Sequence, residues 1–311
     1  MTIAFWMDPI ETINPGKDST YLLIHECIQQ ELNPVFIKNI SSTTEHLRVE
    51  AIQFKPFTLG SPLTVKTESI ELTEKDIDFT WLRKDPPVNE TYIQELLILN
   101  RFSQHIHPIN HIPGILLNNE KLAATQFPTF TPPTLVSSNK TTIKSFINTH
   151  GSTIIKPIDG YGGMGIFKVN ESDTNTDTII ELSTNNESKA IICQKAVDHT
   201  TGDKRIVLVN GDPIGAVKRI NHTGIRNNFM AGGVAEKATI TESDQTIINH
   251  IKPFLLNEGL FFVGIDIIDN HLIEINVTSP TGLQEINKLD NINCQNIIIT
   301  AMTQQKEPQN A

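Results

Sequence analysis

The chain has 311 residues, of which 38% are hydrophobic and 19% are charged, and its formal net charge is −10. This length and composition allow two or three packed subdomains of a soluble globular protein. The negative charge argues against nucleic acid and against a membrane as partners, because both favour basic protein surfaces.

The cysteines and the N-terminus indicate the cellular compartment. Cys27, Cys193 and Cys294 are widely spaced and match no zinc-binding pattern, so we interpret them as free thiols of a reducing compartment. The chain contains no run of 18 apolar residues, and its N-terminus lacks the features of a signal peptide. We therefore expect a cytoplasmic protein.

The N-terminal part of the chain predicts a layered α/β unit. Strands are expected at residues 2–7, 35–37 and 78–84, helices at 19–31 and 89–105, and irregular strands and loops at 45–75. Arg83, Lys84 and Asp85 crowd the end of the third strand, where open α/β sheets usually bind ligands. A local salt bridge at the mouth of a loop would explain them equally well.

A proline-rich break separates this unit from the rest of the chain. We place a domain boundary between residues 118 and 130, after which strands are expected at 134–136 and 152–157 and a helix at 140–149. The chain has no internal repeat, and its one polar, Thr/Asn-rich tract covers residues 170–188.

A glycine-rich loop, DGYGGMG at residues 159–165, lies between two predicted strands. Glycine loses the most conformational entropy on folding, so such a loop makes sense where backbone N–H groups approach a phosphate. A strand follows it rather than a helix, which excludes the P-loop and the dinucleotide-binding fingerprint. We expect a lid over phosphates with Lys156 as a counter-charge. A plain hairpin loop is the alternative.

The last third of the chain predicts further strands at residues 191–197, 206–209 and 214–220, and helices at 241–257, 282–290 and 291–303. The segment 221–233 contains three glycines and few apolar residues, which is typical of a mobile loop.

Residues 261–281 predict a β-hairpin, because two runs of β-branched residues with period-2 alternation flank a turn signal. We expect a three-residue loop at 269–271, which pairs Ile268 with Leu272 and Asp266 with Glu274. The alternation then assigns four isoleucines to the core face: Ile265, Ile267, Ile273 and Ile275.

Asp266, Glu274 and Asn276 share the other face of this predicted hairpin. Two facing carboxylates repel each other unless a cation lies between them. Oxygen ligands of this kind suit Mg²⁺, which takes one or two carboxylates and completes its shell with phosphates. A solvated polar face on an edge hairpin is the alternative.

Short motifs along nearly the whole chain resemble, in this order, those of the ATP-grasp superfamily and, within it, the bacterial glutathione synthetases. They are MDPI (7–10), KDS (17–19), LRKDPP (82–87), NEKL (119–122), KPIDG (156–160) with GG (162–163), GDKR (202–205), AGG (231–233), FVGIDI (262–267) and EINVTSPT (274–281). Each motif is weak alone, but their order is specific, and RKDPP and EINVTSPT point to this family within the superfamily.

The resemblance implies an α/β (α+β) ATP-grasp fold with an N-terminal Rossmann-like domain. We expect three domains: an N-terminal substrate-side domain at 1–120, a central ATP-grasp subdomain at 121–198, and a C-terminal subdomain with metal site and lid at 199–311. The implied enzyme is an ATP-dependent ligase that joins γ-glutamylcysteine to glycine through an acylphosphate, giving glutathione, ADP and phosphate.

The resemblance also implies roles for individual residues. The expected nucleotide contacts are Lys121, Lys156, Asp159, Gly160, Gly162, Gly163, Gln194, Lys195, Ala196, Val197 and Asp203. Arg205, Arg219 and Arg226 would stabilise the acylphosphate and the oxyanion of its adduct. Asp266, Glu274 and Asn276 would hold Mg²⁺, with Mn²⁺ as the alternative ion. Asp18 and Arg83 would line the γ-glutamylcysteine side, and Ser279 and Thr281 the glycine side.

The implied partners are small molecules, with neither nucleic acid nor membrane, in a homo-oligomer that the family suggests is a tetramer. Loop 220–233 would be the lid that excludes water from the acylphosphate. The chain departs from the family pattern by one residue at 110–113, 198–201 and 220–225, and by Asn227 where a glycine is expected. These differences bear on lid geometry and acceptor preference rather than on the ATP chemistry.

Two other hypotheses compete with this assignment. Another ATP-grasp carboxylate–amine ligase, such as a D-alanine ligase or a glutamate-adding enzyme, would not be expected to carry the KDS and RKDPP motifs. A non-catalytic nucleotide-binding protein of the same fold, such as a synapsin, would be favoured if arginines or metal ligands were missing, and all are present. Phosphate release that depends on both substrates discriminates among the three.

Overall fold

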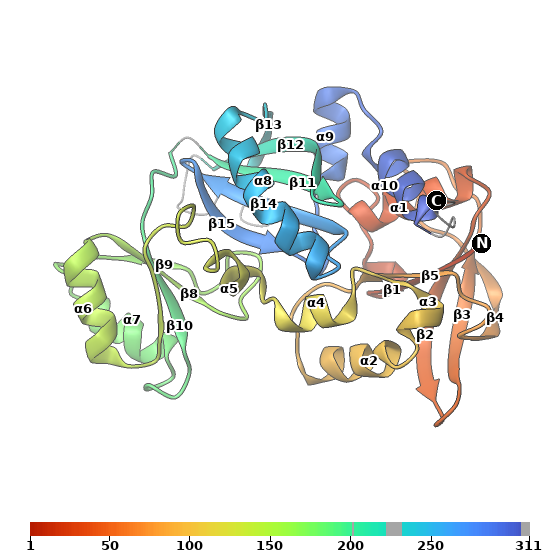
Figure 1. The fold of residues 1–311 in the computed structure, drawn as a ribbon, viewed down its shortest axis with the longest axis horizontal. Helices are drawn as coiled ribbons and strands as arrows, with labels where there is room; N and C mark the ends of the chain where they lie inside the picture. The colour runs from red at the N-terminus through yellow and green to blue at the C-terminus, as the bar shows by residue number, and fades with distance from the viewer. Residues whose placement is uncertain (201, 222–231, 306–311) are drawn as a thin grey trace.

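The computed structural model describes residues 1–200, 202–221 and 232–305. The described residues form three sheets with helices packed against them. Figure 1 shows the six-stranded sheet at one end of the molecule, the four-stranded sheet at the other, and the five-stranded sheet between them.

The six-stranded sheet has the strand order β4-β3-β2-β1-β5-β6, and β1 pairs in parallel with β2 and β5. Its strands are β1 (Thr2–Met7), β2 (Asn33–Ser42), β3 (Leu47–Phe54), β4 (Val65–Thr73), β5 (Phe79–Arg83) and β6 (Pro108–Ile109). Its helices are η1 (Ile10–Thr12), α1 (Ser19–Gln29), α2 (Glu90–Asn100), α3 (Ser103–Ile106) and α4 (Ile112–Leu117). The parallel strands β1 and β5 are buried almost throughout because helices cover both faces, which explains their continuous apolar sequences.

The four-stranded sheet has the order β7-β10-β8-β9 and all its neighbouring strands are antiparallel. Its elements are α5 (Glu120–Ala124), which leads into it, β7 (Thr134–Ser137), α6 (Lys140–His150), β8 (Thr153–Pro157), β9 (Phe167–Val169), α7 (Thr176–Ser183) and β10 (Ile191–Lys195). Isoleucines of α6 and α7 pack on β8 and β10 and form a small core of their own.

The five-stranded antiparallel sheet has the order β13-β12-β11-β14-β15. Its elements are β11 (Asp203–Val209), β12 (Asp212–Ile220), β13 (Val234–Lys237), α8 (Glu242–Asn257), β14 (Phe262–Ile268), β15 (His271–Asn276), α9 (Leu283–Asp290) and α10 (Cys294–Gln304). Each face of this sheet packs into a hydrophobic core. The core on one face lies between the sheet and α8, and the core on the other face is continuous with a core of the six-stranded sheet. Trp81 of β5 contributes to that continuity, because its ring packs edge-on against Phe262 at 5.8 Å.

Local capping explains where several helices begin. The Asp18 carboxylate caps α1 by accepting a hydrogen bond from the Thr20 N–H at 2.6 Å. Thr241 and Asp244 form a reciprocal capping box at the start of α8. Both starts agree with the sequence prediction.

The hairpin prediction was partly wrong. The turn contains two residues, Asp269 and Asn270, both with positive φ, so Ile268 faces His271 instead of Leu272. A bulge one step further along restores the expected pairing of Asp266 with Glu274. The bulge exchanges two side chains between the faces of the hairpin: Leu272 enters the core, while Ile273 is half-buried and lines a cavity.

Four further elements differ from the sequence prediction. The strands β3 and β4 are eight and nine residues long where only irregular strands and loops were expected, and α7 forms within the polar tract 170–188. The edge strand β13 was not expected at all. Each of these elements has a weak local pattern and is stabilised by pairing or packing with a distant segment.

The described part of the chain contains no helix that is both long and apolar enough to span a membrane. The three cysteines are free, as the sequence predicts, and all three are buried.

Candidate active site

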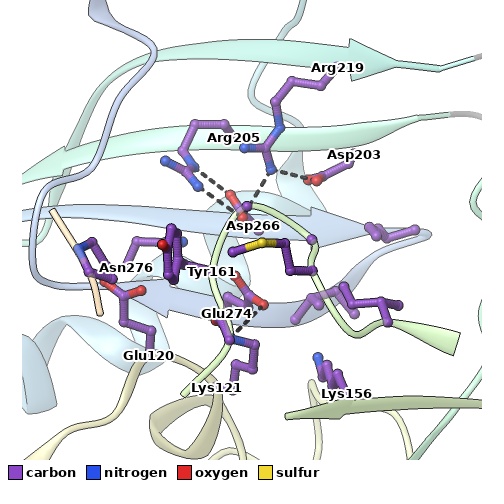
Figure 2. A pocket seen from close by; sticks show the side chains of 18 of the residues that line it. Glu120, Lys121, Lys156, Tyr161, Asp203, Arg205, Arg219, Asp266, Glu274 and Asn276 are labelled. Carbon is purple, nitrogen blue, oxygen red and sulfur yellow. Dashed lines mark hydrogen bonds and ion pairs between the residues drawn. The ribbon is translucent and has the colours of Figure 1, made fainter. Parts of the chain in front are cut away.

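A cavity of about 310 Å³ lies where the four-stranded and five-stranded sheets meet. Its walls come from β8, β10, β11, β12, β14 and β15, from α5, from the loop 160–164, and from residues 278–281. Figure 2 shows the charged side chains that point into it from these separate elements.

The strand register brings arginines and carboxylates together on one wall. Arg205 of β11 lies opposite Asp266 of β14, and Asp203 of β11 lies opposite Arg219 of β12. The Arg205 guanidinium donates through Nε to Asp266 Oδ1 and through Nη2 to Oδ2 at 2.9 Å. Arg219 Nη2 lies 3.0 Å from the same Oδ2 and also donates to Asp203 (Figure 2).

This pairing separates the pKa values of the two buried carboxylates. Burial alone would raise the pKa of Asp266, but the guanidinium groups of Arg205 and Arg219 outweigh burial and hold that pKa well below its usual range. Burial raises the pKa of Asp203 to about 6, because Arg219 only partly offsets the loss of solvent. Asp266 is therefore the permanently ionised member of the cluster.

The hairpin face carries the three predicted metal ligands. Asp266, Glu274 and Asn276 all line the cavity. Asn276 Nδ2 donates to the Gly264 carbonyl at 3.1 Å, so the amide oxygen is the atom that Asn276 can offer to a ligand. Glu274 lies 3.9 Å from the Lys121 ammonium group.

This donor set fits Mg²⁺. An ionised carboxylate has about four acceptor positions, of which Asp266 uses three on arginine N–H groups. Within the described residues no group of three or more His, Cys, Asp or Glu side chains is arranged to hold a metal. The protein thus provides two carboxylates and an amide, and Mg²⁺ usually completes such a shell with phosphate oxygens and water.

Two buried lysines face the hairpin from the other side of the cavity. Lys121 is 8% exposed and donates to the Gly160 carbonyl, and Lys156 is 3% exposed and donates to Gln194 Oε1 at 3.1 Å. Burial lowers the pKa of Lys156, and the nearby Glu274 partly counters that effect. Two buried ammonium groups around one cavity are suited to an anionic ligand.

The glycine loop forms the roof of this part of the cavity, to which Gly160, Gly162 and Gly163 all contribute. Gly162 and Gly163 have φ of 60° and 77°, a region that residues with a Cβ rarely adopt. Glycine at these two positions therefore allows the backbone conformation that the loop adopts beside the cavity.

Most of the remaining residues that the sequence predicts to contact the nucleotide lie on β10, directly after it, or on β11. Gln194, Lys195, Val197 and Asp203 line the cavity. Ala196 is not among the lining residues, and its N–H donates to the Ser152 carbonyl at 2.9 Å.

Asp159 also lies away from the cavity. Its carboxylate forms an exposed ion pair with Lys189 at 3.0 Å. Arg226 and most of the expected lid at 220–233 lie outside the described residues.

The predicted substrate residues fall into two groups. Ser279 and Thr281 line the cavity, where the Ser279 hydroxyl donates to Asp85 and the Thr281 carbonyl accepts from Arg205 at 3.2 Å. Arg83 and Asp18 do not line it.

Arg83 contacts a residue of the cavity wall without lining the cavity itself. It is 3% exposed and donates through Nη2 to the Pro280 carbonyl and through Nε to the Thr20 hydroxyl, both at 3.0 Å. It therefore supports the segment 278–281 from the N-terminal domain.

Sequence reasoning missed Glu120 as a separate site residue. Its carboxylate lines the cavity and accepts hydrogen bonds from residues 277 and 278 of the distant hairpin end. The NEKL motif contains this residue, but nothing in the local pattern says that the first residue of α5 faces the same cavity as Lys121.

Comparisons with known proteins point to one family over nearly the whole chain. A family model described as the prokaryotic glutathione synthetase N-terminal domain matches residues 1–115, and one described as the ATP-grasp domain of the same family matches residues 120–291. A glutathione synthetase of Gloeobacter violaceus is 35% identical over 321 residues, covering 99% of this chain and 98% of that protein. One of Nitrosomonas europaea is 36% identical over 316 residues, covering 98% of each.

Solved structures are similar in fold at much lower identity. The D-cycloserine synthetase DcsG has a TM-score of 0.67 at 12% identity, with 98% of this chain and 99% of that chain covered. D-alanyl-alanine synthetase A of Vibrio cholerae has a TM-score of 0.57 at 15% identity, with 98% of each covered. At such identities the similarity shows the fold alone, and it confirms the expected ATP-grasp fold.

Proposed function

The chain belongs to the prokaryotic glutathione synthetase family, and from this premise we propose how its cavity joins γ-glutamylcysteine to glycine with ATP as the phosphate donor. The enzyme is an ATP-dependent ligase of the glutathione synthetase type. The observation that carries the residue assignments is a single cavity lined by two buried lysines, a glycine loop and the paired cluster of Arg205, Arg219 and Asp266.

ATP would bind between the two sheets. Lys121 and Lys156 supply positive charge for its phosphates, under the loop of Gly160, Gly162 and Gly163. The strand end at Gln194, Lys195, Ala196 and Val197 would hold the adenine. Asp203 would bind the ribose, since its buried Oδ1 has no hydrogen-bond partner among the described residues. Asp159, which is paired with Lys189, would contact the nucleotide only from the edge of the glycine loop.

Asp266, Glu274 and Asn276 would hold Mg²⁺, or Mn²⁺ in its place. A divalent ion held by these residues would neutralise negative charge on the transferring phosphoryl group. The protein's own contribution is to fix these three side chains on one face of the hairpin, where Glu274 lies 3.9 Å from the Lys121 ammonium group.

The arginines would serve the acyl transfer. Asp266 holds the guanidinium of Arg205, and Arg219 is held between Asp266 and Asp203, so both point into the cavity before substrate arrives. Donors positioned in this way stabilise the negative charge of an acylphosphate and of its tetrahedral adduct. Arg226, from the lid, would complete the set.

The two peptide-forming substrates would bind toward residues 278–281. Ser279 and Thr281 would contact glycine, and Arg83 with Asp18 would shape the γ-glutamylcysteine side through the support of this segment. We also propose the three-domain division at 120 and 198, because each sheet falls within one of the three segments. A cytoplasmic homo-tetramer remains a proposal that rests on the family resemblance.

The deciding experiment measures the release of phosphate from ATP in the presence of Mg²⁺, with γ-glutamylcysteine and glycine added singly and together. Release that requires both substrates, a product that co-elutes with glutathione, and loss of turnover in Glu274→Gln are the expected results. Turnover only with another amine would assign a different acceptor. ATP binding without turnover for any amine would instead support a nucleotide-binding protein.

A further inference from the structure

Glu120, the first residue of α5, ties this helix to the end of the metal-site hairpin. Its Oε1 accepts three hydrogen bonds, from the Val277 N–H at 3.0 Å, the Thr278 N–H at 3.1 Å and the Thr278 hydroxyl at 2.8 Å. In Figure 2 its carboxylate lies with Asn276 and Tyr161 on one side of the cavity. One oxygen of the carboxylate is thus fully used by the protein.

The other oxygen is not used in this way. Within residues 1–200, 202–221 and 232–305, no hydrogen bond ends on Glu120 Oε2 and no Lys, Arg or His lies within ion-pair distance of this carboxylate. The residue is only partly buried and lines the cavity, so a ligand in the cavity can reach Oε2. A carboxylate at the wall of a cavity without a counter-charge is unfavourable until a cation joins it.

The electrostatics of the neighbourhood agree with a missing cation. Burial raises the pKa of Glu120, and Glu274 adds to that rise, although the hydrogen bonds from Thr278 and, as a smaller effect, the charge of Lys121 oppose it. Lys121 follows directly in the chain, but its ammonium group is directed to Gly160 and Glu274.

An organic ammonium group suits this position better than a metal ion. Oε1 is occupied by N–H and O–H donors, which leaves a single oxygen, and the oxygens that we propose for Mg²⁺ are already provided by Asp266, Glu274 and Asn276. Glu120 also holds Thr278, the residue that precedes Ser279 on the acceptor side of the cavity. An ammonium group at Oε2 would therefore belong to the acceptor substrate.

We propose that Glu120 Oε2 binds the ammonium group of the acceptor amine. This inference rests on the proposed function, under which the acceptor is glycine. The amine is thereby held beside Ser279, next to the cavity wall that carries Arg205, in position to meet the acylphosphate carbon.

The test compares glycine with hydroxylamine as acceptors of the same acyl group. Each forms a C–N bond to the acyl carbon while the C–O bond to phosphate breaks, and phosphate leaves with the electron pair. In both cases the nitrogen gives one proton to the departing phosphate as the amide forms. Glycine enters as an ammonium ion, so it must first release a further proton to water before its nitrogen can attack, whereas hydroxylamine is uncharged at neutral pH and attacks directly. Only glycine should need the carboxylate.

The informative variant is Glu120→Gln, whose amide oxygen can still accept the three hydrogen bonds at Oε1. We expect kcat/KM for glycine to fall about 10- to 100-fold, the value of a charge-assisted hydrogen bond, and hydroxamate formation to stay within about twofold of wild type. Glu26→Gln is the matched control. Glu26 is a buried carboxylate that accepts hydrogen bonds from Gln30 and Asn296 and does not line the cavity, so both rates should be unchanged.

Three results for Glu120→Gln would each overturn the inference. They are an equal loss of activity with glycine and with hydroxylamine, an unchanged kcat/KM for glycine, and a rise confined to the KM of γ-glutamylcysteine. A wild-type enzyme that forms neither glutathione nor hydroxamate from γ-glutamylcysteine would overturn the proposed function and this inference with it. If Glu120→Gln does not fold, wild-type enzyme still provides a test. Glycolate has a hydroxyl in place of the ammonium group, so its inhibition constant against glycine should be at least about tenfold higher than the KM of glycine. An inhibition constant equal to that KM would refute ammonium recognition.

Discussion

Arg205 and Asp266 face each other across β11 and β14, and two nitrogens of the guanidinium donate to the two oxygens of the carboxylate. The pair is almost completely buried, and it places the arginine that we propose for the acylphosphate beside a carboxylate that we propose for Mg²⁺. Under this proposal, the same contact serves both stability and chemistry.

Removal of this carboxylate should be costly. Asp266→Asn leaves the Arg205 charge buried and removes one of the partners of Arg219, so we expect a loss of roughly 3 kcal/mol in the free energy of unfolding, measured by urea denaturation. The control Asp212→Asn breaks the exposed pair with Lys252 and should cost less than about 1 kcal/mol. Similar losses in the two variants would contradict the buried role of the pair.

ATP affinity should fall as the pH becomes alkaline. Burial lowers the pKa of Lys156 in the free protein, whereas bound phosphates favour its charged form and raise that pKa. Between the two values binding takes up a proton, so the Kd for ATP rises with pH. Calorimetry from neutral pH to about pH 10 measures this, since an unperturbed lysine titrates near 10.4.

The matched variant is Lys156→Arg, whose guanidinium stays charged over this range and should remove the pH dependence. The exposed Lys168→Arg should behave like wild type. The assignment of Lys156 to the phosphates would be refuted by the same slope in wild type and Lys156→Arg.

The bulge in the hairpin makes a prediction about two neighbouring isoleucines. Ile275 is fully buried, so Ile275→Ala should cost about 2–5 kcal/mol of unfolding free energy. Ile273 lines the cavity and Ile273→Ala should cost about 1 kcal/mol or less. A larger loss at Ile273 would mean that the register expected from sequence is the correct one after all. Thermal or urea unfolding of both variants decides between them.

Gly264 controls the approach of Arg205 to the sheet. A Cβ at this position would lie 3.0 Å from Arg205 Cδ and from Pro280 Cβ, so Gly264→Ala must displace at least one of them. Because small misplacements of positioned groups are costly in catalysis, we expect kcat/KM to fall roughly 10- to 100-fold in the phosphate-release assay. In Gly16→Ala the new Cβ meets its nearest atom at 3.5 Å, and activity should not change. Full activity in Gly264→Ala would show that Arg205 needs no fixed position.

Local patterns predicted the elements whose own sequences carry a clear signal. The buried strands β1 and β5 have continuous apolar sequences, and α1 and α8 begin at capping residues that are visible in the sequence. The edge strand β13 and the helix α7 have no such signals, because their stability comes from neighbours that the local sequence does not contain.

By itself, the sequence determined that Glu274 and Asn276 share one face, because side chains alternate along a strand. Its ordered motifs also identified the family. Asp266 lies on the same face because the two-residue turn and the bulge together restore its pairing with Glu274. Only the tertiary structure decided that Arg205 faces Asp266, that the hairpin turn has two residues, and that Glu120 meets Thr278, 158 residues away. Those contacts depend on which strands become neighbours, and that order is set by the packing of distant apolar faces into shared cores rather than by any local pattern.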